Sequence, residues 1–389
     1  MAQRSCGSNN EQAEVSEIGL WSNGITFHSL CIVICAFSTL TAILLAGLLI
    51  IGHATHYSKP TEQQYIIRIL FMVPVYSTTS FLCVYFFKES VYYEVIGECY
   101  EPFAIASFFT LLCCYIAPDL RSQKIYFRKI KPINWVWPIN WMQRITGGTC
   151  SGALRKPRSG LTWFNIIWIG VFQYCLLRVI MTVVAVATES ANLYCEDSIS
   201  PVFSHVWVLA IESIAVTIAM YCLIMFYIQI KDDIKEHQPW LKIVCIKLVI
   251  FLSFWQSTLI DLLVSAGILS DSSKVSKEDW SIGLPNLLLC VEMAVFAVLH
   301  FWGFPWKPYT LPMDVLVSGS GQQYYSGKFG LRAILDALNP WDLIKASARG
   351  FRWLFVGHKS RKLDSSYSLS DVPEEQDKHP LTAKASTWI

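Results

Sequence analysis

The chain has 389 residues, of which 53% are hydrophobic and 15% are charged. A soluble domain usually carries about 25% charged residues, and here the apolar residues gather in runs of the ~20 residues that a helix needs to cross a bilayer. The net charge of +2 shows no excess that favours nucleic acid as a partner. Composition therefore excludes an ordinary soluble domain and predicts an integral membrane protein.

The N-terminal tail, residues 1–28, is polar and contains Glu11, Glu14 and Glu17. It lacks the basic-then-apolar order of a cleaved signal peptide, so we expect the first apolar run to be retained as a membrane helix. Seven apolar runs predict an all-α membrane protein, a seven-transmembrane-helix bundle over residues 29–310, because a bilayer offers no partner to an open strand edge. The predicted spans are Leu30–Ile51, Tyr65–Phe87, Tyr100–Leu120, Thr162–Ala187, Phe203–Ile230, Leu241–Leu269 and Leu284–Trp302.

Lysine and arginine are unevenly shared between the two sides of the predicted bundle. The loops after the first, third and fifth spans, with their flanks, hold fourteen: Lys59, Arg68, Arg121, Lys124, Arg128, Lys129, Lys131, Arg144, Arg155, Lys156, Arg158, Lys231, Lys235 and Lys242. The opposite side holds four: Arg4, Lys88, Lys274 and Lys277. Because cytosolic loops carry the excess of basic residues, we expect the N-terminus outside the cell or in a lumen and the C-terminus in the cytosol.

Two predicted cytosolic segments have features of the membrane surface. The loop 121–161 is basic and aromatic: either its charges only follow the orientation bias, with its tryptophans at the lipid interface, or it binds anionic lipid. The segment 311–359 is predicted to hold an amphipathic helix, which either lies on the membrane or packs under the bundle. The apolar face of that helix is formed by Leu331, Ile334, Leu335 and Leu338. The tail 360–389 is polar and Ser-rich, and we expect it to be disordered.

Five ionisable residues fall inside the predicted spans: Arg178, Glu212, Lys247, Asp261 and Glu292. A charge in the middle of a membrane helix costs about 2.5 kcal/mol or more, so such residues face partners or a water-filled cavity. Arg178, Glu212 and Glu292 lie eight or nine residues from the same side of the membrane. We therefore predict that Glu212, Glu292 or both balance Arg178. The group is either a structural ion pair or the lining of a solute or ion cavity.

Helical spacing assigns faces to the sixth and seventh spans. Lys247 and Asp261 are fourteen residues apart and share one face, whereas Gln256 lies on the opposite side. Glu292 and His300 are eight residues apart on one face of the seventh span. Two interpretations stay open for this pair: a proton relay, or a histidine that only packs in the core.

The second predicted span, Tyr65–Phe87, carries both Arg68 and Pro74. Arg68 is predicted close to the cytosolic edge, with its stem in lipid and its guanidinium at the interface. Pro74 removes a backbone donor, so we expect a kink at mid-span. Arg68, Met72 and Tyr76 share one face, which we expect to look into the bundle.

Most of the 13 cysteines lie within spans and are expected to pack as small apolar residues. Cys99 and Cys195 are predicted on the side opposite the cytosol, where oxidising conditions permit a disulfide. A disulfide and two free thiols both stay open. Cys113 and Cys114, in the cytosolic half of the third span, are either acylation sites or packing residues.

Seven segments between about residues 57 and 343 resemble, in order, the organic solute transporter alpha and transmembrane protein 184 family, and its transmembrane protein 184 branch most. They read YSKPTEQQYIIRILFMVPVYSTTSF, YEPFAIASFFTLL, FQYCLLR, IAMYCLIMFY, IKLVIFLSFWQ, LLLCVEMAVFAVLHFWGFPWKPY and DALNPWDL. The resemblance implies a seven-helix bundle that takes part in transport of steroid-like and other organic solutes, beside a small single-span partner. It implies motif roles for Gln173, Arg178, Glu292, Pro60, Arg68, Pro74, Tyr76, Glu101 and Gln256.

No zinc-protease, nucleophile-elbow, phosphate-loop or dinucleotide signature is present in the sequence. We therefore predict no catalytic residue, metal or cofactor, and expect a protein that is not an enzyme. The favoured function is a transporter, or transporter subunit, for amphipathic organic solutes. Its candidate cavity residues are Arg178, Glu212, Glu292, Gln173, Lys247, Asp261 and His300.

Two other functions stay open. One is a seven-helix receptor or signalling protein, disfavoured because APDLRSQ stands where such receptors carry Asp-Arg-Tyr. The other is a trafficking or scaffold protein that uses the basic loop and the tail. The expected partners are membrane lipids, a small amphipathic solute, and either a single-span subunit or a second copy of the chain, with no nucleic acid.

Overall fold

The computed structural model describes most of the chain. Described are residues 24–146, 159–191, 200–235, 284–312 and 323–355, with shorter pieces at 19–20, 156–157, 193–194 and within 241–283. Every regular element in these stretches is a helix, and the described residues form no strand. The predicted all-α class is therefore confirmed for the described part of the chain.

Six described helices are long and apolar enough to cross a membrane. They are α1 (Phe27–Thr55), α2 (Pro60–Tyr85), α3 (Ser90–Ile116), α6 (Gly160–Ser190), α7 (Ser204–Ile230) and α9 (Leu284–Gly303). They confirm six of the predicted spans, and the largest difference is α3, which begins at Ser90 rather than at Tyr100. The other predicted span, Leu241–Leu269, lies mostly outside the described residues, so the count of seven stays a prediction.

Capping residues account for where several helices begin. The Thr26 hydroxyl accepts a hydrogen bond from the Ser29 amide at 3.1 Å, and α1 begins directly after it. The Ser159 hydroxyl accepts from the Leu161 amide at 3.3 Å at the start of α6. Pro60 is the first residue of α2, a position whose N–H would have no partner within the helix.

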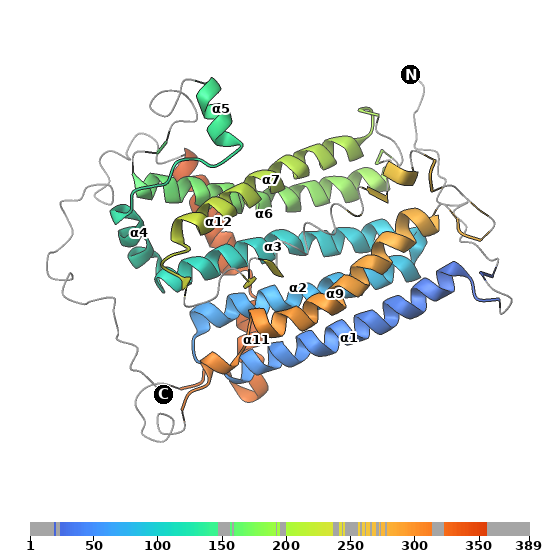
Figure 1. Cartoon of the computed structure of the whole chain (residues 1–389), viewed down its shortest axis with the longest axis horizontal. Coiled ribbons are helices and arrows are strands. Elements are labelled where there is room, and N and C mark those ends of the chain that lie inside the picture. Colours follow the sequence, from blue (N-terminus) through green and yellow to red (C-terminus); the bar gives the residue numbers. More distant parts are fainter. Residues whose placement is uncertain are drawn as a thin grey trace.

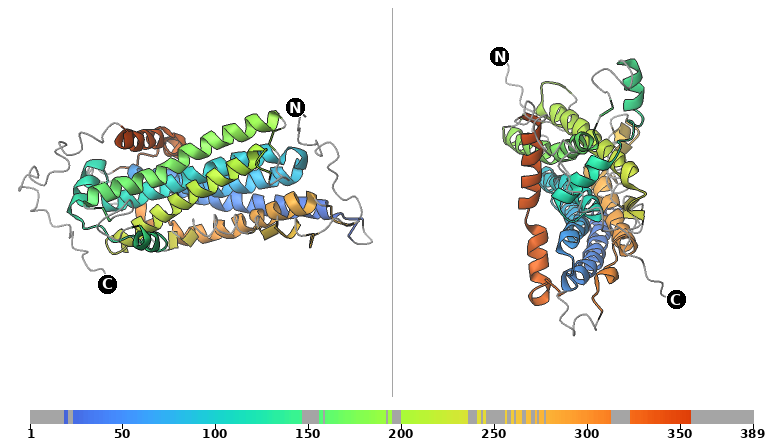
Figure 2. Two further views of the ribbon diagram at one scale, coloured as in Figure 1. Left: turned by 90° about the horizontal axis from the view of Figure 1, so that it is seen from above. Right: turned by 90° about the vertical axis from the view of Figure 1, so that its left-hand side faces the viewer.

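The long helices run side by side along the longest axis of the molecule (Figures 1 and 2). In one group α2 packs against α1, α3 and α9; α6 and α7 pair with each other and join this group through α3. Glycine allows long helices to approach closely at positions that include Gly97 and Gly170. A Cβ atom at Gly97 would lie 2.7 Å from the Thr79 hydroxyl on α2, and one at Gly170 would lie 2.3 Å from the Cys222 sulfur on α7.

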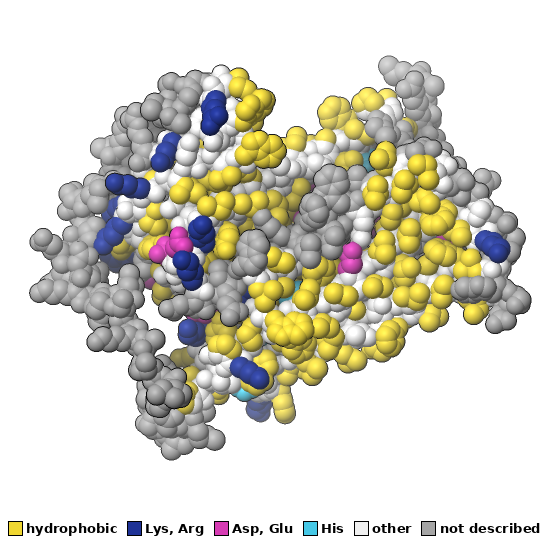
Figure 3. Space-filling view, viewed as in Figure 1, with side chains coloured by type: hydrophobic (Ala, Val, Ile, Leu, Met, Phe, Trp, Pro, Cys, Tyr) yellow, Lys and Arg dark blue, Asp and Glu magenta, His cyan; other side chains and the backbone are white. Residues whose placement is uncertain are grey.

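The two ends of the bundle differ in charge. We call one the α1–α2 end, after the connection at residues 56–59; it also carries α4 (Leu120–Lys129) and α5 (Ile139–Ile145). The other, the α2–α3 end, carries the short 3-10 helix η2 (Phe87–Glu89) and the start of α9, which follows the short π-helix η4 (Asp279–Gly283). On the face shown in Figure 3, lysine and arginine gather at the α1–α2 end, on the left, and apolar side chains cover the middle.

Two C-terminal helices, α11 (Leu331–Leu338) and α12 (Trp341–Phe355), cross the side of the bundle near the α1–α2 end (Figure 2). We call this pair the strap. It packs on α2, α1, α6 and α3 through its small residues and one leucine: Ala333, Ala337, Leu343, Ala346 and Gly350. Three members of the predicted apolar face, Leu331, Leu335 and Leu338, are more than half exposed. The strap therefore leaves large apolar side chains outside.

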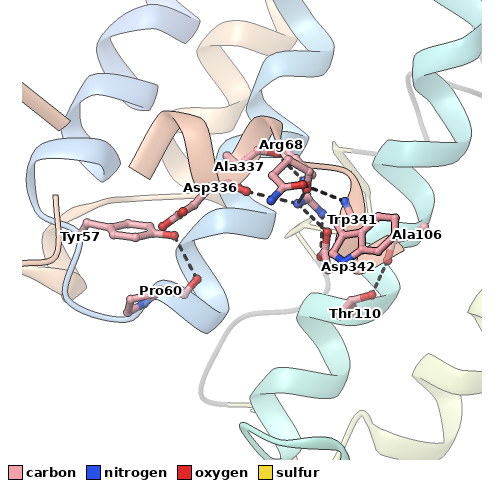
Figure 4. A network of polar contacts seen from close by, with 10 residues as sticks. Tyr57, Pro60, Arg68, Ala106, Thr110, Asp336, Ala337, Trp341 and Asp342 are labelled. Atoms are coloured by element: carbon pink, nitrogen blue, oxygen red, sulfur yellow. Dashed lines mark hydrogen bonds and ion pairs between the residues drawn. The ribbon is translucent and has the colours of Figure 1, made fainter. Parts of the chain in front are cut away.

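The sequence predicts that the stem of Arg68 lies in lipid and its guanidinium at the interface; in the structure Arg68 is instead covered by the strap and is 5% exposed. Its guanidinium donates to both carboxylate oxygens of Asp342 at 2.9 and 3.0 Å (Figure 4). It also donates to the carbonyls of Ala337 at 2.6 Å and Asn339 at 2.8 Å. These carbonyls lie at the C-terminal end of α11, where no further N–H of the helix can donate to them and where the negative end of the helix dipole lies. Arg68 thus caps α11 and pairs with the start of α12.

Candidate functional site

The main polar cluster within the described spans is centred on Arg178 of α6, which is 6% exposed. Its guanidinium makes an ion pair of 2.5 Å with Glu212 of α7 and another of 2.5 Å with Glu98 of α3. The predicted contact between Arg178 and Glu212 is confirmed. Glu98 was predicted in a loop before the third span; because α3 begins at Ser90, it lies within the helix instead.

A second carboxyl from α3, Glu101, completes the cluster beside two tyrosines. The hydroxyl of Tyr174 on α6 donates to one of its oxygens at 3.1 Å, and that of Tyr76 on α2 donates to the other at 3.4 Å. Tyr76 belongs to the face that was predicted to look inward. Met72 and Tyr76 of that face pack in the core of the bundle, whereas Arg68, although buried, points to the strap. Four helices therefore contribute to one cluster.

Two prolines stand next to the cluster on neighbouring helices. Pro74 lies inside α2, half a turn before Tyr76, and Pro102 lies inside α3, directly after Glu101. Each lacks the N–H that would bond to the carbonyl four residues earlier. Separately, the carbonyl of Pro102 accepts a hydrogen bond from the Cys175 thiol of α6 at 3.1 Å. The backbone beside the cluster thus has fewer helical hydrogen bonds than elsewhere.

Gln173 ties α6 to α7 below Arg178. Its side-chain amide donates to the carbonyl of Ala215 at 2.8 Å and to that of Gly170 at 3.2 Å. This contact lies on the same pair of helices as the close approach of Gly170 to Cys222. Together these contacts fix the separation of α6 and α7, and so hold Arg178 within reach of Glu212.

The cluster contains more negative than positive groups. Glu98, Glu101 and Glu212 face one guanidinium, that of Arg178. Glu101 is the twelfth of the 27 residues of α3, so it lies near the middle of its span. Charges interact more strongly where burial removes screening, as it does around Arg178, whose side chain is 8% exposed, and less so around Glu98, whose side chain is 42% exposed. The arrangement can therefore exchange hydrogen-bond partners, bind a polar group or bind a proton.

Glu292 is not part of this cluster: of the two predicted partners of Arg178, Glu212 pairs with it and Glu292 does not. Its carboxylate accepts from the side-chain amide of Gln256 at 3.3 Å, and α9, which carries it, packs on α1 and α2 rather than on α6. His300 is 1% exposed, beside Phe304 at 5.5 Å between ring centroids. In the described structure neither of its ring nitrogens has a hydrogen-bond partner, so the proton relay remains a prediction.

Several predicted site residues lie elsewhere or outside the described part. Lys247, Asp261 and Cys195 are outside the described residues. The Cys99 sulfur lies 3.0 Å from the Thr182 hydroxyl, and the disulfide to Cys195 remains a prediction. Cys113 is fully buried, which favours packing over acylation at that position. Across the described residues, no group of three or more histidine, cysteine or acidic side chains is placed to hold a metal ion.

Sequence reasoning missed Glu98 and Tyr174 as members of the cluster. Tyr174 precedes Arg178 by four residues and therefore lies on the same helical face, a signal that was available. Glu98 and Glu101 are likewise three residues apart and share a face of α3. The start of α3 carries too few apolar residues to be predicted as part of a span, so Glu98 was not assigned to the helix.

The cluster lies within helices of membrane-spanning length and composition, and the protein is a multi-pass integral membrane protein. Residues 31–309, which include every residue of the cluster, match the family model described as organic solute transporter Ostalpha. The match covers most of the chain, and the chain belongs to this family, as its motifs indicated. The family is of solute-transporter type and is not an enzyme family.

Two relatives show how far the similarity extends. A transmembrane protein 184 homolog of Dictyostelium discoideum is 28% identical over 313 residues, which are 79% of this chain and 59% of the relative. Vacuole membrane protein hfl11 of Schizosaccharomyces pombe is 29% identical over 283 residues, which are 72% of this chain and 63% of the relative. The alignments thus span about three fifths of either relative. No solved structure matches the chain.

Proposed function

We propose that this protein moves amphipathic organic solutes, steroid-like or lipid-like, across a membrane, alone or beside a small single-span partner. The observation that supports this most is the cluster of Arg178, Glu98, Glu101 and Glu212 between helices of an apolar bundle, with the Arg178 guanidinium buried and the Glu98 side chain 42% exposed. Charges in spans cost insertion free energy, and they are usually kept for function. A buried ion pair alone contributes little net stability compared with apolar packing.

The position of the cluster suits a solute site. Glu98, Glu101 and Tyr76 come from the helix group around α2, whereas Arg178 and Glu212 come from the α6–α7 pair. A polar head group that competes for the guanidinium would weaken the link between the two groups. Differential contact of this kind is what a ligand needs to shift a conformational equilibrium.

An aromatic layer lies next to the cluster, toward the α1–α2 end. Phe109 of α3 lies 5.5 Å from Trp168 and 6.0 Å from Phe172 of α6, between ring centroids. These rings are largely buried in the core. A steroid-like body bound beside the cluster would rest against this layer, with its polar group at Arg178.

We infer that the α1–α2 end faces the cytosol and that the strap lies in the interface of the cytosolic leaflet. Lysine and arginine gather at this end (Figure 3), in keeping with the rule for cytosolic loops. Outward-facing Leu335 of the strap is 67% exposed and Phe355 is 72% exposed. An interfacial helix would bury such side chains in lipid while Arg352 reaches the head groups. In this orientation the N-terminus is lumenal or outside.

Uptake into proteoliposomes tests the proposed transport. The purified chain is reconstituted with and without candidate single-span partners, and entry of a radiolabelled steroid sulfate, a neutral steroid and a cationic amphiphile is measured. We expect uptake of at least one probe, and its loss in Arg178→Ala. The control is Thr217→Val, on the outward face of α7, which should behave as the wild type. No uptake of any probe under any condition would favour the receptor or scaffold alternatives.

A further inference from the structure

The three carboxyls of the cluster are not equivalent. Glu98 and Glu212 each make a direct ion pair with Arg178. Glu101 makes none: over the described residues its hydrogen-bond partners are two neutral phenols, those of Tyr76 and Tyr174. It is therefore the carboxyl of the cluster without a direct counterion.

The charge balance of the cluster sets the state of Glu101. Arg178 carries one positive charge. Two ionised carboxylates carry two negative charges, so the cluster already has one negative charge more than Arg178 can balance. A third ionised carboxylate would add a further uncompensated charge in a membrane interior, where like charges close together cannot all stay ionised. The groups that face Glu101 are Arg178 and Tyr174 from α6, Tyr76 from α2, Glu98 from its own helix and, farther off, Glu212 from α7.

The tyrosines suit either state of the carboxyl. When Glu101 is ionised, each phenol donates to one of its oxygens, as the distances of 3.1 and 3.4 Å indicate. When Glu101 holds a proton, its own O–H donates to one phenol oxygen, since a tyrosine hydroxyl both donates and accepts. Only hydroxyl rotation is needed, so a proton can bind or leave without rebuilding the site.

We propose that Glu101 is the proton-binding residue of the cluster: it holds a proton while Arg178 is paired with Glu98 and Glu212, and releases it when Arg178 turns to Glu101. This inference rests on the proposed function only for its consequence, that the proton couples to solute movement. The proton enters from water on one side and leaves to water on the other, so no further reactant is required. Glu101 then links the charge of the site to the separation of α3 from α7.

Infrared difference spectroscopy of the reconstituted protein tests the proton itself. We expect the carbonyl-stretch band of a protonated carboxyl at neutral pH, its loss as the pH is raised, and its absence from Glu101→Gln. Glu189→Gln, the same chemical change in the last turn of α6 and outside the cluster, should retain the band. A band that persists in Glu101→Gln, or no band in the wild type, would overturn the proposal.

A second measurement separates this proposal from the proposed function. In proteoliposomes that take up a labelled probe, the wild type should accumulate more probe under a pH gradient than at equal pH. In Glu101→Gln the ratio of these two accumulations should fall to about one, whatever rate of exchange the variant retains. Glu101→Asp should restore part of that accumulation. PH-driven accumulation at the wild-type level in Glu101→Gln would overturn the coupling. If the infrared band behaves as expected and no probe is taken up, Glu101 still binds the proton, and it is transport that fails.

Discussion

Replacing Arg68 by alanine should release the strap. The change leaves the carboxylate of Asp342 and the carbonyls of Ala337 and Asn339 without the donor that holds them at 2.6 to 3.0 Å. Removing one partner of a buried ion pair typically lowers the stability of the folded contact by about 3–5 kcal/mol. The Asp342 side chain is 34% exposed and keeps part of its hydration, so we take the low end, about 3 kcal/mol.

Hydrogen exchange measured by mass spectrometry on the protein in lipid nanodiscs reads out this release. About 3 kcal/mol is on the order of a 100-fold shift in the equilibrium between docked and undocked strap. Peptides from α11 and α12 should therefore exchange on the order of 100-fold faster in Arg68→Ala. The matched control is Arg332→Ala, an exposed arginine of α11, which should leave exchange unchanged. Equal exchange in wild type and Arg68→Ala would refute the argument.

Two further predictions follow from close contacts. Gly170→Ala should lower the thermal stability of the purified protein, because its Cβ would meet the Cys222 sulfur at 2.3 Å. Overpacking of this kind lowers the free energy of unfolding by about 1–3 kcal/mol. Adding Cys222→Ala should recover part of the lost stability. At the start of α4, hydrogen bonds from the side chain and then the amide of Ser122 hold the pKa of Asp119 below its usual value. After correction for the intrinsic pH dependence of amide exchange, the protection of α4 amides should therefore fall as the pH falls through that lowered pKa, and Asp119→Ala should abolish this change in protection. The same profile of protection against pH in Asp119→Ala and in the wild type would contradict the prediction.

Hydropathy was enough to predict six long helices, because each apolar run is longer than the bilayer core requires. Counting residues from the ends of the spans also predicted that Glu212 and Arg178 lie at similar depth in the membrane. The same count placed Glu292 at that depth, but depth alone does not say which helices are neighbours. In the structure α9 packs on α1 and α2, and Arg178 lies on α6.

The misses on Glu98 and Arg68 have different physical causes. The first third of α3 is polar because part of it faces other polar groups of the bundle, so hydropathy placed the start of the helix too late. Arg68 was expected at the lipid interface because its partner, Asp342, lies 274 residues away in a segment outside the spans. No local pattern links two such residues, and only the docking of the strap brings them together.

The central claim is that the Arg178 cluster serves solute movement rather than helix packing. The most direct test is a neutral replacement, Glu98→Gln with Arg178→Met and Glu212→Gln, since uncharged groups of similar size often preserve the stability that a buried ion pair provides. We predict a monodisperse protein that unfolds close to the wild-type temperature and takes up labelled solute no faster than empty liposomes do. Uptake at the wild-type rate by this folded variant would contradict the claim and leave the cluster a structural one.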